Sequence, residues 1–484
     1  MNSSFSNIKG EIRENIALDR IDSALRIAFN FVERIITEPL CTSRVFASRD
    51  LDMLCQEIGR INLKREILSN KNPVAVKIES KRLVYVVSRL QNSGGHLRII
   101  LEMIAAQPTK EHLILATNVV GVSDVAFLSN YFSKHDNVFI AYAPHGTFAN
   151  RLTWLQRALL ETNVEHVYLF HHHQDSVAVA AFVPELNLQG SFCHHGDHHL
   201  CLGVHLSHVR HLDFHPMAYH YCREELGVDN IYVPLVCADQ GGIDSNEAFS
   251  HEGCLTTVTV ARSNKLDTRY YVRYVELVPR ILECTKGRHI HIGKLTRLAL
   301  NKIKAGMIRR RISINRFVYV EWTPSVWRTL VQYKVDLYLS SFPLGAGLTL
   351  IEAMGAGVPV VMHEHIFSRV HSSLELAYPH AYRWSDPEKL LEYLSHITPE
   401  QIRKERGWAR SQYKRFHQPK YLKSFLEDGN STQRQDIPAL ISDFRPKLDE
   451  WAAWAEAQLS ASHLLYRWAH RMWRLLRARF QWHS

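Results

Sequence analysis

The feature that most constrains the fold is a regular alternation of short, β-rich apolar runs with helical stretches of about 10 to 15 residues. The alternation begins with RLVYVV at 82–87 and reaches HVYLF at 166–170. It restarts with LTTVTVA at 255–261 and continues to 358–362. Strands separated by helices are typical of βαβ units with parallel pairing, so the sequence predicts an α/β protein with two doubly wound, Rossmann-like domains. A chain of 484 residues is also too long for a single hydrophobic core.

The two arrays set the expected domain boundaries. We expect a helical N-terminal extension over 1–78, where apolar residues recur at helical spacing and glycine is rare. The first Rossmann-like domain is expected over 79–240, the second over 250–420, and C-terminal helices over 421–484. The two domains should face each other across a cleft, with a ligand at the carboxyl ends of the strands.

The second array contains a glycine-bearing segment, SSFPLGAGLTLIEAMGAGVPVV, at 340–361. It has the pattern of a strand, a loop, a helix start and the next strand. We expect Gly345 and Gly347 to let the backbone pass close to a ligand, since neither carries a Cβ. The free amides and positive dipole end of the following helix suit a diphosphate. Thr349 adds a hydroxyl donor, and Glu352 lies about one turn in, where its carboxylate can accept from both ribose hydroxyls.

This segment resembles the donor-site motif of the GT-B glycosyltransferases, in which a loop, a helix N-terminus and a helix carboxylate hold a nucleotide sugar. The large retaining group of that fold has two glutamates eight positions apart, and the earlier position here is Leu344. The Phe-Pro-Leu-Gly-x-Gly-x-Thr form is more similar to inverting enzymes related to O-GlcNAc transferases and bacterial protein glucosyltransferases, which use UDP-sugars. The resemblance implies a hexosyltransferase that needs no metal or other cofactor. Its donor-binding residues in this segment would be Gly345, Gly347, Leu348, Thr349 and Glu352.

Three cations lie after strands of the same array. Arg262 and Lys265 follow the first strand, as the basic residues of GT-B donor sites do, and Lys294 follows the second. Such cations would offset the negative charge that develops on a leaving diphosphate. The alternative is that they are solvated surface side chains.

A histidine-rich segment, SFCHHGDHHLCLG at 191–203, follows the last helices of the first array. An inverting transferase must take a proton from the acceptor, and histidine suits this general-base role because its pKa is near neutral. His195 and Asp197 are the first candidates, with Asp197 able to orient an imidazole. His194 and His198 are the next candidates.

A second loop of the first array, SGGH at 93–96, follows its first strand. It resembles the acceptor-side glycine loop of GT-B enzymes. Gly94, Gly95 and His96 would therefore approach the transferred sugar.

The histidine-rich segment also has an alternative interpretation. The string CHHGDH at 193–198 is similar to the His-x-His-x-Asp-His motif of metallo-β-lactamase-type hydrolases, and His171–His173 could complete a metal centre. The first ligand position is Cys193, however, and the string lies in an α/β array rather than a β-sandwich. A metal-dependent hydrolase is therefore kept as an alternative, and no residue is assigned as a metal ligand.

The net charge and the cysteines indicate which kinds of partner and which cellular compartment to expect. The net charge of +10 favours acidic partners such as nucleotide phosphates or anionic membranes, and no nucleic-acid-binding motif is visible. The eight cysteines are scattered without a C-x-x-C pair, which is typical of reduced thiols in the cytoplasm. Met1–Asp19 lacks the apolar core of a signal peptide, and no run approaches the roughly 18 apolar residues of a membrane span.

The end of the chain predicts an amphipathic helix. Its apolar positions are interleaved with arginines, a pattern that can lie in an anionic membrane interface. The apolar face comprises Leu465, Trp468, Met472, Leu475, Leu476 and Phe480. The alternative is a helix packed back across the domains.

Together these features predict a cytoplasmic enzyme, peripheral at the inner face of a membrane if the last helix binds lipid. It would transfer a sugar from a nucleotide sugar to a glycan, a lipid-linked glycan or a protein, as in polysaccharide biosynthesis. A GT-B-like protein that binds nucleotide sugars or glycans without catalysis is the second hypothesis.

Overall fold

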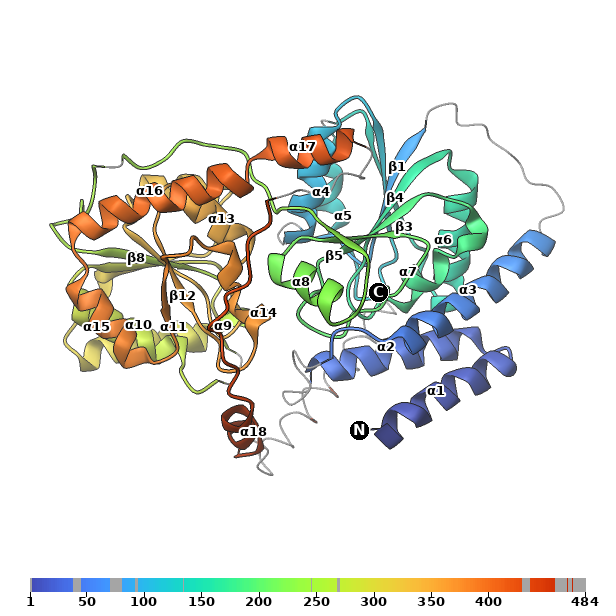
Figure 1. The fold of residues 1–484 in the computed structure, drawn as a ribbon, viewed down its shortest axis with the longest axis horizontal. Coiled ribbons are helices and arrows are strands. Elements are labelled where there is room, and N and C mark those ends of the chain that lie inside the picture. The colour runs from blue at the N-terminus through green and yellow to red at the C-terminus, as the bar shows by residue number, and fades with distance from the viewer. Residues whose placement is uncertain are drawn as a thin grey trace. The chain divides into compact units, whose positions relative to one another are not determined.

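The computed structural model describes residues 2–37, 45–69, 81–91, 95–133, 135–244, 246–267, 270–428 and 436–457, together with Trp468 and Met472 (Figure 1). The chain forms two compact units. Unit 1 holds Met1–Phe214 and Ala218–Val233, and unit 2 holds His215–Met217 and Pro234–Trp454.

Unit 1 is built on a parallel sheet with the strand order β3-β2-β1-β4-β5-β6-β7. Its strands are β1 (Arg82–Val87), β2 (Glu111–Ala116), β3 (Val138–Tyr142), β4 (Val164–Phe170), β5 (Gly190–His194), β6 (Arg210–Asp213) and β7 (Asn230–Tyr232). The order reverses between β1 and β4, which is the doubly wound arrangement. Five of the six residues of β1 are fully buried, as expected for a strand covered on both faces.

Helices connect these strands and cover the sheet. They are α4 (Gly95–Ala106), α5 (Val125–Phe132), α6 (Phe148–Glu161), α7 (Ser176–Ala181) and α8 (Pro216–Glu224). Each begins just beyond the carboxyl end of a strand. The loops that precede the helices therefore gather at one edge of the sheet.

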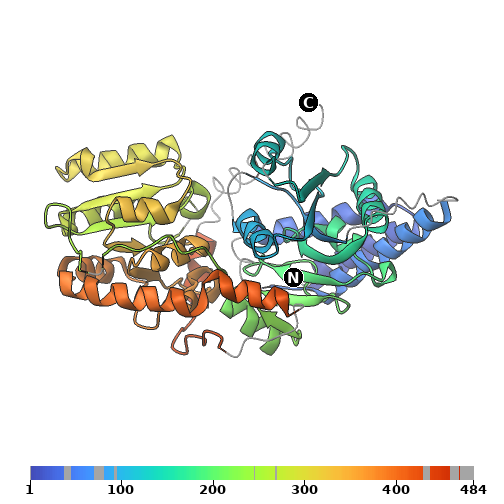
Figure 2. The same ribbon diagram turned by 90° about the horizontal axis from the view of Figure 1, so that it is seen from above.

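The N-terminal helices α1 (Asn2–Ala17), α2 (Ile21–Thr37) and α3 (Arg49–Ser69) belong to the core of unit 1. They lie along the side covered by α6 and α7 (Figures 1 and 2). Asp22 Oδ1 accepts hydrogen bonds from the amides of Phe148 and Ala149 at the start of α6. Gln56 Nε2 donates to the carbonyl oxygens of Val179 and Phe182 around α7. The described part of the N-terminal segment is thus mostly helical, and it packs against α6 and α7.

Unit 2 repeats the same topology with the order β10-β9-β8-β11-β12-β13, again fully parallel. Its strands are β8 (Thr256–Val260), β9 (Arg288–Ile292), β10 (Phe317–Val320), β11 (Leu337–Leu339), β12 (Val360–His363) and β13 (Tyr382–Trp384). Its helices are α9 (Ser263–Leu266), α10 (Tyr274–Thr285), α11 (Arg297–Arg309), α12 (Val326–Gln332), α13 (Leu348–Gly355), α14 (Arg369–Ser372), α15 (Pro387–His396), α16 (Pro399–Phe416), α17 (Pro419–Glu427) and α18 (Leu448–Ala457).

Within unit 2, α10 and α11 lie on one face of the sheet and α13 and α16 on the other (Figure 1). Both predicted βα arrays are therefore present, and the prediction of an α/β fold with two Rossmann-like domains is confirmed.

A buried carboxyl group couples the N-terminal helices to the histidine-rich segment. Asp52 on α3 is 1% exposed and accepts hydrogen bonds from the amides of Gly203 (2.7 Å) and His205 (3.0 Å). Burial outweighs these two hydrogen bonds and raises the pKa of Asp52 to about 7. The folded state therefore holds a proton that the unfolded chain has released, and Asp52 loses its contribution to stability as the pH rises from about 4 through about 7.

We predict that Asp52→Asn flattens this pH dependence, because the amide cannot ionise. Urea midpoints measured from about pH 4 to about pH 7 should fall more steeply for the wild type than for the variant. Asp50→Asn, which changes an exposed carboxylate of the same helix, is the matched control. Parallel curves for wild type and Asp52→Asn would contradict the prediction.

Candidate functional site

The turn from β11 to α13 has the form of an anion site. Strand β11 ends at Leu339, the loop follows, and α13 begins at Leu348 with Gly347 in the N-cap position. No side chain of the described residues caps this helix. Its first amides are therefore left for a ligand, and the helix dipole favours a negative one.

Lys265 lies directly beside this loop. It sits on α9, just after β8, and its Nζ donates a hydrogen bond to the carbonyl oxygen of Gly345 at 2.7 Å. Burial lowers the pKa of Lys265 to about 8, so the amine is still mostly protonated at neutral pH. Lys265 therefore contacts the glycine loop through a backbone carbonyl group.

The two glycines of the loop differ in what requires them. A Cβ at Gly345 would lie 2.4 Å from the carbonyl oxygen of His371, and the Gly345 amide donates to that oxygen at 2.8 Å. The close approach at Gly345 is therefore to another protein segment. A Cβ at Gly347 would be in ordinary van der Waals contact with the His215 imidazole and the Leu235 side chain, at 3.6 to 3.8 Å. Protein packing alone therefore does not require a glycine at this position.

Thr349 and Glu352 lie on the first turns of α13. The Thr349 hydroxyl pairs with Tyr338 Oη at 3.0 Å, and when Tyr338 donates, the Thr349 hydrogen remains for a ligand oxygen. Glu352 is only 7% exposed. Burial, with the Glu352 charge as a smaller cause, raises the pKa of Tyr338, which therefore stays a neutral donor.

The other two cations predicted for the donor side, Arg262 and Lys294, are more exposed than Lys265. Arg262 occupies the N-cap position of α9 without a capping hydrogen bond from its side chain. The Lys294 side chain is 76% exposed and pairs with Glu321 at 3.3 Å.

Trp322, which was not among the predicted site residues, follows β10 and is 65% exposed. The sequence feature that could have indicated Trp322 is its position as a bulky aromatic residue just after a predicted strand. That strand, β10, ends at the same edge of the sheet as β8, β9 and β11.

In unit 1, the hydrogen bonds of His195 leave a lone pair on one ring nitrogen, as a general base needs. Its Nδ1 is 3.1 Å from the carbonyl oxygen of Cys193, which can only accept, so Nδ1 carries the hydrogen. The lone pair is then on Nε2, which is buried and has no hydrogen-bond partner among the described residues. Burial, followed by the neighbouring His96 and His172, lowers the pKa of His195 well below 6.5. His195 is therefore neutral at pH 7.

Three histidines meet around this position. His96 begins α4, His172 follows β4 and His195 follows β5, and their ligand nitrogens lie within 4.8 Å of one another. The ring centroids of His96 and His195 are 3.6 Å apart. The structure thus brings together a residue predicted for the acceptor loop and one predicted as the base. Gly95 is exposed at the start of α4, and Gly94 lies outside the described residues.

The other candidates of the histidine-rich segment have different surroundings. His194 is 2% exposed, and its Nδ1 contacts Asp213 Oδ1 at 2.8 Å inside the unit. Asp197 is 5% exposed and accepts from His198 Nδ1 at 3.2 Å. The His198 side chain is 37% exposed. Of the four, His195 and His198 are partly exposed, and Nε2 of His195 is itself buried.

No family model and no curated protein matches this sequence. Among solved structures, Anabaena HepE in complex with UDP and glucose matches with a TM-score of 0.54 at 11% identity, over 72% of this chain and 99% of that one. A glycosyltransferase from Rickettsia africae matches with a TM-score of 0.55 at 12% identity, over 72% of this chain and 97% of its own. The lipopolysaccharide outer core galactosyltransferase WaaB matches with a TM-score of 0.51 at 14% identity, over 72% of this chain and 99% of its own. These similarities confirm the predicted GT-B fold.

The packing of the glycine loop gives a direct test. Gly345→Ala should cost about 1 to 3 kcal/mol of unfolding free energy, since its Cβ overlaps backbone atoms at His371. Gly407→Ala is the matched control, because a Cβ there meets nothing within 4 Å on an exposed stretch of α16. The control should gain about 0.5 to 1 kcal/mol. Equal denaturant midpoints for the two variants would contradict the geometry.

Proposed function

We propose that this protein is an inverting glycosyltransferase that uses a UDP-sugar as its donor. The observation that carries the proposal is the uncapped N-terminus of α13, which has Gly347 in the N-cap position, Lys265 beside the loop and Glu352 buried on its first turns. Solved structures of the same fold supply a precedent, since Anabaena HepE forms complexes with UDP and with UDP-glucose.

The donor would lie along the carboxyl edge of the second sheet. Its diphosphate would accept hydrogen bonds from the amides of Leu348 and Thr349, with Lys265 beside it. Glu352 would accept from the ribose hydroxyls. The base would stack on Trp322, because β10 is three strand positions from β11, about 14 Å, which matches an extended nucleoside diphosphate.

Arg262 and Lys294 complete the donor side of the proposal. Both follow strands that end at this edge, so their charges would attract the nucleotide and offset negative charge on it.

The transfer would be a single displacement. An acceptor hydroxyl oxygen forms the new bond to the anomeric carbon, while the bond from that carbon to the diphosphate oxygen breaks. The bonding electron pair leaves with UDP, where Lys265 and the α13 amides stabilise the charge. The acceptor proton goes to Nε2 of His195, the lone pair left by the hydrogen bond at Nδ1. None of these steps calls for a metal ion or another cofactor.

The acceptor is proposed only by class: a glycan, a lipid-linked glycan or a protein. No helix among the described residues is long and apolar enough to cross a bilayer. On the apolar face of the predicted C-terminal helix, Trp468 and Met472 are helical and exposed, and the other positions lie outside the described residues. We keep attachment of this face to anionic lipid as part of the proposal, since it would bring the enzyme to a lipid-linked acceptor.

The proposed nucleotide site can be tested by substitution of Glu352. Glu352→Ala should raise the Kd for UDP by about 10- to 100-fold, because the ribose hydroxyls lose a charged acceptor. Calorimetric titration measures this, and Glu283→Ala, at an exposed carboxylate of α10, should leave the Kd unchanged. If UDP, GDP, ADP, CMP and dTDP derivatives all fail to bind the wild type, the proposed function is wrong.

The base is tested separately from binding. His195→Ala should leave the Kd for UDP within about twofold and reduce sugar transfer by at least about 100-fold. His220→Ala, on the outer part of α8, serves as the control and should keep full activity. Undiminished transfer by His195→Ala would remove this residue from the mechanism. A wild type that binds UDP but transfers no sugar from any donor would favour the non-catalytic alternative.

A further inference from the structure

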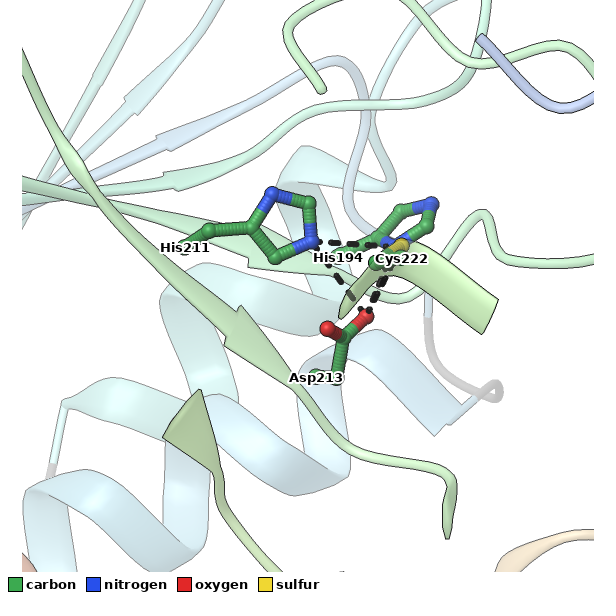
Figure 3. Close-up of side chains that lie close together, drawn as sticks. All are labelled: His194, His211, Asp213 and Cys222. Atoms are coloured by element: carbon green, nitrogen blue, oxygen red, sulfur yellow. Dashed lines mark hydrogen bonds and ion pairs between the residues drawn. The ribbon is translucent and has the colours of Figure 1, made fainter. Parts of the chain in front are cut away.

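A second group of buried polar side chains lies beneath the histidine-rich segment and takes no part in the proposed transfer. It consists of His194, His211, Asp213 and Cys222, hereafter the buried donor cluster (Figure 3). Their exposed fractions are 2%, 3%, 0% and 1%. Two imidazoles, a carboxylate and a thiol in one dry site are costly unless their charges and lone pairs are satisfied.

Strand register and one helix bring these residues together. Strands β5 and β6 pair in parallel, with His194 opposite Asp213. His211 lies two residues before Asp213 on β6, so the two side chains share a face of the sheet. Helix α8 supplies Cys222 to the same point (Figure 3). Because the cluster spans three segments, its formation depends on the fold of unit 1.

The four potential ligand atoms all lie within 4.8 Å of one another. His194 Nδ1 lies 2.8 Å from Asp213 Oδ1, 3.2 Å from His211 Nε2 and 3.6 Å from Cys222 Sγ. Asp213 Oδ1 lies 3.3 Å from His211 Nε2 and 3.8 Å from Cys222 Sγ. A tetrahedral zinc ion with bonds of about 2.0 to 2.3 Å holds its ligand atoms about 3.3 to 3.6 Å apart. Four of the five distances are within about 0.2 Å of that range.

Hydrogen bonds around the cluster orient its ligand atoms. His211 Nδ1 faces the carbonyl oxygen of Val204 at 3.3 Å, so Nδ1 carries the hydrogen and the lone pair of Nε2 faces the cluster. Asn230 Nδ2 donates to Asp213 Oδ2 at 2.6 Å and to the carbonyl oxygen of Tyr219 at 2.8 Å. This leaves Asp213 Oδ1 for the centre. Such outer contacts are typical of the groups that position metal ligands.

Charge gives an independent argument. No lysine or arginine of the described residues pairs with Asp213, and the lone pair of His211 Nε2 faces its carboxylate oxygen. A divalent cation bound by one carboxylate, one thiolate and two neutral imidazoles leaves the buried site electrically neutral.

We propose that the buried donor cluster is a structural zinc site. All four ligands come from the protein and the site is closed, which is typical of zinc that holds a fold together rather than zinc that activates water. The ion would join β5, β6 and α8, and would anchor the strand end that carries His195. This site is independent of the proposed transferase activity and differs from the string at 193–198, with which it shares only His194.

Metal content tests the proposal directly. The full-length wild type, purified without chelator, should contain about one zinc ion per chain by elemental analysis. Cys222→Ser and Asp213→Asn should each contain less than about a tenth of this amount. Cys201→Ser is the matched control, because it changes another buried cysteine of unit 1, whose thiol donates to the carbonyl oxygen of Leu202 and is not in the buried donor cluster. The control should keep its zinc.

A second measurement guards against variants that fail to fold. Wild type stripped with a strong chelator should melt at a lower temperature and recover when zinc alone is added. Cobalt added to the stripped protein should give a sulfur-to-metal charge-transfer band, as expected for a Cys222 thiolate ligand. A metal-free wild type whose melting does not respond to zinc would overturn the proposal. Zinc retained in Cys222→Ser and Asp213→Asn would overturn it as well.

Discussion

Parallel strand pairing is the constraint on which the rest of this structure depends. In each sheet the strand order reverses beside the first strand, and every carboxyl end faces the same edge. In unit 2 that edge carries Lys265, the glycine loop and the N-terminus of α13. In unit 1 it carries the three histidines that follow β1, β4 and β5. Residues far apart in sequence thereby become neighbours without any motif that links them.

Burial then decides what each polar residue can do. His194 and His195 are adjacent in sequence, yet one contacts Asp213 inside the unit and the other keeps a lone pair without a partner among the described residues. Strand alternation explains the contrast, because successive side chains at the end of β5 point in opposite directions. The N-terminal helices reinforce this arrangement, since Asp52 on α3 holds the backbone at Gly203 and His205, just after the histidine-rich segment.

The sequence predicted those features that depend on residues close together in the chain. Apolar periodicity predicted both sheets, and the segment 340–361 predicted the strand, loop and helix that the structure contains. It was uninformative where tertiary structure decides. His211, Asp213 and Cys222 form no spaced motif, and they meet His194 only through the pairing of β5 with β6 and the position of α8. Gly345 was assigned to ligand approach, whereas its neighbour is the His371 carbonyl, a contact between distant segments. Trp322 gave no periodic signal because it lies in a loop.

The proposed function requires a donor diphosphate to bind at the start of α13. A crystal structure of the protein soaked with UDP tests this most directly. We predict phosphate oxygens within hydrogen-bond distance of the Leu348 and Thr349 amides, with the Lys265 ammonium beside them and Glu352 at the ribose. A diphosphate bound at any other place, with the α13 amides facing only water, would contradict the claim.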